Sequence, residues 1–169
     1  MSLRAALVLL LPEPRLEELR VRFDPVGTAA GIPLHITLLF PFGLDEEGVE
    51  EFFARWTPLT FSLARVEEFP GVVWLAPEPD EELRERILEL YARYPQYPPY
   101  GGEFPDPVPH ATLSQVAEGA SQEELVAAVR AEVEPLLPVE FDARAATLME
   151  EVAPDRWRVG ESFPFEGAA

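Results

Sequence analysis

A four-residue pattern occurs twice in the chain and constrains its fold more than any other feature. His35-Ile-Thr37-Leu and His110-Ala-Thr112-Leu lie about 75 residues apart and contain both histidines of the protein. Each begins an apolar segment of strand length, where alternate residues face the same side. The repetition therefore predicts two strands that each present a His and a Thr on one face, in two related halves of the chain.

The flanking segments support this division into halves. Apolar runs predict strands, and amphipathic stretches with capping signals predict helices, in the order β-α-β-α-β-β-α-β-α-β-β. We expect strands at residues 5–11, 34–40, 59–66, 72–76, 110–116, 139–152 and 157–163, and helices at residues 14–23, 45–56, 80 onward and 121–136. The pattern predicts an α+β fold with one domain, residues 1–169, built from two pseudo-symmetric lobes.

The alternation also predicts a polar and an apolar face in each motif strand. An imidazole supplies or takes a proton, and a hydroxyl two residues later donates to an oxygen, so each motif suits an anion such as a phosphate. Two copies are able to hold one phosphate from both sides. The faces are His35 and Thr37 opposite Leu34, Ile36, Leu38 and Phe40, and His110, Thr112 and Ser114 opposite Ala111 and Leu113.

Composition excludes several other kinds of site. The absence of cysteine rules out disulfides, thiolate metal sites and cysteine nucleophiles. A metal site on the two histidines is the alternative to phosphate binding, but no carboxylate follows either histidine at i+2 or i+4. The net charge of −18 disfavours long nucleic acids and leaves room for a small anionic ligand.

The apolar segments are too short for a membrane span of about 20 residues. The apolar run near the N-terminus is not followed by a small-residue cleavage site, which argues against a signal peptide. We expect a cytoplasmic, monomeric protein that binds neither membranes nor long nucleic acids.

The paired motifs resemble those of the 2H phosphoesterase superfamily, in particular its bacterial 2′-5′ RNA ligase and RNA 2′,3′-cyclic phosphodiesterase group. The segments VVWLAP at residues 72–77 and VPHATL at residues 108–113 extend the likeness. The resemblance implies a bilobal fold in which two antiparallel or mixed sheets face a central cleft, with helices outside. It also implies a phosphoric diester hydrolase without metal or cofactor, with RNA ligation as a side activity.

The expected substrate is the 2′,3′-cyclic phosphate of a nucleotide or a short RNA end. In that reaction one imidazole deprotonates water, the other protonates the departing ribose oxygen, and Thr37 and Thr112 hold the non-bridging oxygens. We assign His110 as the base and His35 as the acid, and the pseudo-symmetry leaves the reverse assignment open. The alternative function is a non-catalytic sensor that keeps both motifs to bind a nucleotide or phosphoester.

Two departures from the family pattern affect the expected substrate-binding walls. Many cyclic phosphodiesterases of the group carry Arg two positions after the second motif, where this chain has Gln115. The first motif is followed by Phe40-Pro-Phe-Gly43, where those enzymes often read Phe-Leu-Gly.

The segment before the second motif, residues 94–109, is rich in proline and tyrosine and predicts an irregular loop. Tyr97 and Tyr100 are candidates to stack on a base, and Tyr100 is our predicted substrate-binding residue. The alternative is that these tyrosines pack on the body of the protein. The tryptophans are expected in the core or at its edge: Trp56, Trp74 and Trp157.

Overall fold

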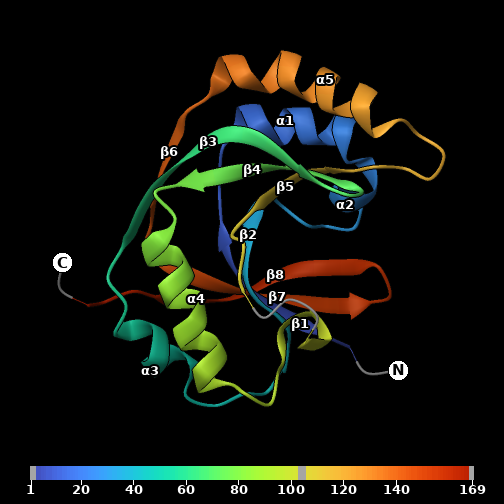
Figure 1. The fold of residues 1–169 in the computed structure, drawn as a ribbon. Helices are drawn as coiled ribbons and strands as arrows, with labels where there is room; N and C mark the ends of the chain where they lie inside the picture. Colours follow the sequence, from blue (N-terminus) through green and yellow to red (C-terminus); the bar gives the residue numbers. More distant parts are fainter. Residues whose placement is uncertain (1–2, 103–105, 168–169) are drawn as a thin grey trace.

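A single antiparallel sheet forms the centre of the protein (Figure 1). The computed structural model describes residues 3–102 and 106–167. Within these ranges eight strands follow the order β6-β3-β4-β5-β2-β1-β7-β8. Their bounds are β1 Ala5–Leu10, β2 His35–Phe42, β3 Leu59–Phe69, β4 Val72–Glu78, β5 Ala111–Gln115, β6 Val139–Ala143, β7 Ala145–Ala153 and β8 Arg156–Pro164.

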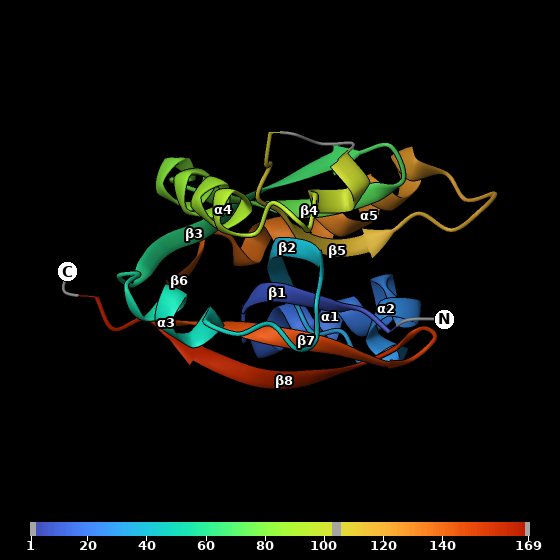
Figure 2. The ribbon, with the colours of Figure 1, turned by 90° about the horizontal axis from the view of Figure 1, so that it is seen from below.

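The sheet consists of two related halves of four strands, β6-β3-β4-β5 and β8-β7-β1-β2. They are joined where β2 lies beside β5, through one antiparallel partner pair, Ile36 and Ala111. In Figure 2, β3, β4 and β5 lie in one layer and β1, β7 and β8 in another, with β2 between them. The α+β class is confirmed. The expected pair of separate sheets is replaced by one curled sheet, because the two motif strands form hydrogen bonds with each other.

Helices cover the sheet and cross between its halves. Helix α1, which follows β1, contacts β5, whereas α4, which follows β4, contacts β2. Each half therefore supports the motif strand of the other, and α1 and α5 lie side by side (Figure 1). The bounds are α1 Pro14–Phe23, α2 Pro25–Ala29, α3 Val49–Ala54, α4 Glu81–Arg93 and α5 Gln122–Val133, with 3₁₀ turns η1 Pro99–Gly102 and η2 Glu134–Leu136. None of these described helices is long and apolar enough to cross a bilayer.

Two predicted elements differ from the structure. Helix α3 begins at Val49, and not at the expected cap Asp45, because Gly48 takes a left-handed conformation with φ of 82° at the N-cap. The expected long strand at residues 139–152 divides after Ala143. Its first part, β6, pairs with β3, and its second part, β7, pairs with β1 and β8. One continuous apolar stretch thus contributes to both halves of the sheet.

Candidate active site

The two His-x-Thr motifs meet at the junction between the halves of the sheet. The joining pair of β2 and β5 has no exposed side-chain surface and faces the main core. Continuing its antiparallel register by one residue in each direction places His35 opposite Thr112 and Thr37 opposite His110, on the other face. Opposed residues have Cβ atoms about 4.5–5.5 Å apart, and diagonal neighbours such as the two histidines lie about 7–8 Å apart. Each imidazole therefore lies beside the hydroxyl of the other motif.

Both imidazoles are oriented by the backbone in the same way. Nδ1 of His35 lies 2.8 Å from the carbonyl oxygen of Pro33, and Nδ1 of His110 lies 2.7 Å from that of Val108. A carbonyl oxygen only accepts, so Nδ1 carries the proton in each neutral ring and Nε2 holds the lone pair. Each ring is thus prepared to accept a proton at Nε2 when neutral and to donate one from Nε2 when protonated.

A one-residue register shift follows each His-x-Thr pair and changes which residues share its face. On β2, Thr37 is the partner of Val8 but Leu39 is the partner of Leu7, so the intervening leucine is an extra residue and the next side chain changes face. Phe40 therefore lies on the site face and packs in a small cluster apart from the main core. The expected position of Phe40 among the core residues was wrong, because strict alternation ends at the shift.

The same shift occurs on β5. Trp74 is the partner of Thr112 but Val73 is the partner of Ser114, so Leu113 is the extra residue. Ser114 is consequently buried on the core side, where its hydroxyl donates to the carbonyl oxygen of Phe23 in α1. The expectation that Ser114 shares the face of Thr112 was wrong for the same reason as at Phe40.

A cavity of 570 Å³ opens beside the motifs. Thr37, Tyr100 and His110 are among its lining residues, together with side chains of β4 and α4. His35 and Thr112 are not among them, although the register places them next to His110 and Thr37. Its volume falls in the range of small-molecule sites, about 300–1,000 Å³. The cavity therefore reaches one of the two directly opposed His–Thr pairs, His110 and Thr37.

The predicted loop divides into tyrosines with different environments. Tyr97 packs 4.9 Å from Phe42, and its hydroxyl donates to Glu46, so it belongs to the body of the protein. Tyr100 lies at the cavity instead, with its side chain hydrogen-bonded to Thr37. It is held there by a left-handed backbone conformation with φ of 49°. Burial raises the pKa of the Tyr100 phenol, and the bond with Thr37 opposes this rise.

Comparisons with known proteins match this geometry to a family. The model of the 2′-5′ RNA ligase superfamily matches residues 10–155. The chain belongs to the 2′-5′ RNA ligase superfamily. No curated protein matches the chain.

Several solved structures are similar to this chain over almost its whole length. A phosphoesterase crystal structure is similar with a TM-score of 0.62 at 20% identity, over 98% of this chain and 99% of that one. Escherichia coli LigT complexed with NADP⁺ gives a TM-score of 0.60 at 20% identity, over 98% and 99%. The protein TT0787 of Thermus thermophilus gives 0.59 at 22% identity, over 98% and 100%. These likenesses confirm the α+β class and a LigT-like fold, in which one curled sheet takes the place of the two separate sheets that the resemblance implied.

In this member of the 2′-5′ RNA ligase superfamily, the wall beside the second motif is apolar. Phe69 lies 5.4 Å from the ring of His110 and Trp74 lies 5.8 Å from it, both nearly edge-on. Gln115 is the partner of Val72, a cavity-lining residue, and so shares its face. The position where Arg is common in the group is thus on the site face but carries no charge.

Phe69 and Trp74 were not predicted as site residues. Strand alternation in the sequence places Trp74 on the same face as Val72, which lines the cavity. Because tryptophan is apolar, we expected Trp74 in the core or at its edge. It is 7% exposed, and its indole N–H has no hydrogen-bond partner among the described residues.

Burial lowers the pKa of both histidines from the ordinary value of 6.5. At His35 the positive charges of Arg20 and His110 lower the pKa further, whereas Glu17 and the backbone hydrogen bond oppose this. Arg20 is itself buried and is paired with Glu17 at 3.0 Å and Asp24 at 3.4 Å. The sequence predicts these two ion pairs, because Arg20 follows Glu17 by three residues and precedes Asp24 by four. That Arg20 lies near His35 depends on the fold and was not predictable from the sequence.

Glu17 also links α1 to the first motif. Its carboxylate accepts a hydrogen bond from the backbone N–H of Leu34, the residue before His35.

Among residues 3–102 and 106–167, no group of three or more His, Cys, Asp or Glu side chains is arranged to hold a metal ion.

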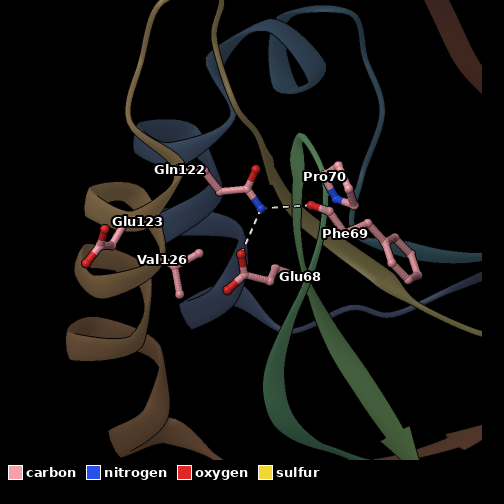
Figure 3. A pocket seen from close by; sticks show the side chains of 6 residues that line it. All are labelled: Glu68, Phe69, Pro70, Gln122, Glu123 and Val126. Carbon is pink, nitrogen blue, oxygen red and sulfur yellow. Dashed lines mark hydrogen bonds between the residues drawn. The ribbon is translucent and has the colours of Figure 1, made fainter.

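A second, shallower groove of 470 Å³ lies between the β3-β4 turn and the start of α5 (Figure 3). Gln122 crosses it: its Nε2 donates to Glu68 at 2.9 Å and to the Phe69 carbonyl at 2.8 Å (Figure 3). Its Oε1 accepts from the Gly71 N–H at 2.8 Å. The amide thus attaches the hairpin to α5. This contact fixes the strand end that carries Phe69 beside His110.

Proposed function

We propose that this protein is a metal-independent cyclic phosphodiesterase that hydrolyses the 2′,3′-cyclic phosphate of a nucleotide or a short RNA end. The observation that carries the proposal is the matched pair of imidazoles, each with Nδ1 bonded to a backbone carbonyl. They flank the Ile36–Ala111 partner pair, and continuing its register puts each imidazole beside the hydroxyl of the opposite motif. In-line displacement at phosphorus needs a base and an acid on opposite sides, with donors for the charge that develops. Two related half-sites provide this arrangement.

In the proposed reaction a neutral imidazole accepts a proton from water at Nε2 while the water oxygen bonds to phosphorus. The bond from phosphorus to one ribose oxygen breaks, and the second imidazole donates its Nε2 proton to that oxygen. The product is a ribose phosphomonoester, and Thr37 and Thr112 donate to the non-bridging oxygens. A ribose hydroxyl in place of water would give ligation as a side reaction.

The electrostatics favour His35 as the base. Burial lowers the pKa of both histidines, and at His35 the positive charge of Arg20 lowers the pKa further, although Glu17 opposes this effect. His110 then acts as the acid. This is the reverse of the assignment made from sequence, where the pseudo-symmetry had left both directions open.

Small nucleotide ligands are consistent with the comparisons. Escherichia coli LigT has been crystallised with 3′-AMP, at a TM-score of 0.59 and 19% identity to this chain. For this chain we propose that Tyr100 stacks on the base of such a ligand, since it lies at the cavity and beside Thr37. The net charge of −18 supports a short and not a long nucleic-acid substrate.

A sensor function is the second candidate, and one observation favours it. Asp106 is the only charged side chain among the described residues that line the cavity, and Gln115 brings no cation to that face. A negative wall weakens the binding of an anionic substrate and leaves less stabilisation for developing charge.

The decisive experiment measures hydrolysis of adenosine 2′,3′-cyclic phosphate by the wild type, His35→Ala and His110→Ala. Loss of one acid–base group is expected to lower kcat by about 10²- to 10⁴-fold, and the double variant should be far less than multiplicatively worse because the two groups act together. Arg144→Gln, which removes only an exposed ion pair with Asp142, serves as the control. A wild type that binds the cyclic nucleotide without turnover would establish the sensor function instead.

A further inference from the structure

An aromatic cluster adjoins the site on the side of β1, β7 and β8. The ring centroid of Phe40 lies 6.1 Å from that of Tyr100 and 6.1 Å from that of Trp157. The guanidinium carbon of Arg4 lies 5.1 Å from the Phe40 centroid and 5.9 Å from that of Trp157. Because Tyr100 is also bonded to Thr37, these groups form a continuous line that starts at a hydroxyl of the site.

The sheet register places this cluster on the face of the site. Val8 is the partner of Thr37, and Ala6, two residues earlier in β1, therefore points to the same side. Ala6, Val8 and Met149 are buried beneath the rings of Phe40 and Trp157, in a cluster separate from the main core. The two rings are only partly buried, so they retain surface for a planar group.

The charges around Arg4 favour an uncharged ring over a phosphate as the occupant. Nε and Nη2 of Arg4 donate to the Glu151 carboxylate at 3.2 and 3.1 Å, and Asp155 also interacts electrostatically with this arginine. These two carboxylates neutralise the positive charge of Arg4, so a phosphate would gain little from binding beside it. The Arg4 side chain is nevertheless 50% exposed, and a guanidinium plane or an aromatic ring stacks on any base.

We propose that Trp157 and Arg4 form a subsite for the nucleobase that precedes the cyclic-phosphate nucleotide. The substrate class is then an RNA end of at least two nucleotides. This inference rests on the proposed function, because it requires the terminal phosphate to lie between the two motifs. The terminal nucleoside lies beside Tyr100, and the preceding base stacks further along the line, on Trp157.

The test compares kcat/KM for adenylyl-adenosine ending in a 2′,3′-cyclic phosphate with that for adenosine 2′,3′-cyclic phosphate. The wild type is expected to prefer the dinucleotide by about 5- to 150-fold, the contribution of one base–aromatic stack. Trp157→Ala should remove this preference while leaving kcat/KM for the mononucleotide within about twofold of wild type, and Trp157→Phe should keep most of it. Arg4→Gln should reduce the preference.

A matched control lies on the opposite face of the same strands. Arg158 pairs with Glu150 at 2.7 Å, as Arg4 pairs with Glu151, but successive residues of β7 point to opposite sides. Arg158→Gln removes an equivalent ion pair away from the cluster. It should leave the dinucleotide preference unchanged.

Equilibrium binding separates failure of the subsite from failure of the proposed function. Calorimetry with adenylyl-adenosine 3′-phosphate and with 3′-AMP does not depend on turnover. Tighter binding of the dinucleotide that is lost in Trp157→Ala would support the subsite even in an inactive protein. Equal affinity for both ligands in the wild type, or an equal loss of kcat/KM for both substrates in Trp157→Ala, would overturn it.

Discussion

Raising the pH above 6.5 is expected to lower kcat/KM for a cyclic nucleotide by about tenfold per pH unit, because both of the histidines that we propose as catalytic have lowered pKa values. Turnover needs one neutral and one protonated imidazole. A group with a pKa of 6.5 is protonated in only about 10% of molecules at pH 7.5, and both histidines lie below that reference value. The optimum of kcat/KM should therefore lie on the acidic side of pH 6.5.

Substrate binding should move the alkaline limb. An anionic phosphate beside the protonated imidazole stabilises its charge and raises its pKa. The alkaline limb of kcat, which reports the bound complex, should consequently lie at higher pH than that of kcat/KM, which reports the free enzyme. The separation between the limbs measures how strongly the phosphate and the acid interact.

The assay combines a pH series of initial rates with an NMR titration of the imidazole protons. The chain contains only two histidines, so two Hε1 resonances are expected, and His35→Ala and His110→Ala each leave one. The wild-type midpoints describe the pair, since His110 acts electrostatically on His35. A kcat/KM plateau that continues above pH 7.5, or NMR midpoints above 6.5 in the free protein, would refute the reasoning from burial.

Three further outcomes test the site and its support. Thr112→Val should lower kcat by about 30- to 1,000-fold with little effect on stability, as expected for a lost donor to developing charge, measured with the cyclic nucleotide. Ser114→Ala should lower the free energy of unfolding in urea by about 1–3 kcal/mol because the buried carbonyl of Phe23 loses its donor, while kcat stays within about twofold. Dialysis against EDTA should leave turnover unchanged, and a loss restored by a divalent metal would contradict the metal-independent reaction.

Much of the fold was predictable because it depends on local patterns. The apolar runs identified the strands, and the β3-β4 and β7-β8 hairpins form at the expected turns. Ser121 caps α5 by accepting the Glu124 N–H at 3.2 Å, as its spacing indicated. The paired motifs also predicted two related strands, β2 and β5, which pair at Ile36 and Ala111.

Long-range pairing was not predictable from the same patterns. One apolar stretch supplies β6 and β7 to opposite halves of the sheet, and alternation along a strand carries no information about which strand lies beside it. The effect of Arg20 on His35 was not predictable for the same reason. The residues near Arg20 along α1 predict its ion pairs, but Arg20 lowers the pKa of His35 only because α1 packs against the sheet.

The leucine that ends the second motif explains why both faces of its strand were partly mispredicted. Leu113 is the extra residue of a register shift, and Leu38 occupies the same position in the first motif. Such a shift bends and twists its strand, and β2 and β5 share only the one partner pair between their motifs. The repeated leucine thus has two effects: it fills the core, and it shifts the register of its strand directly after the His and Thr of the motif.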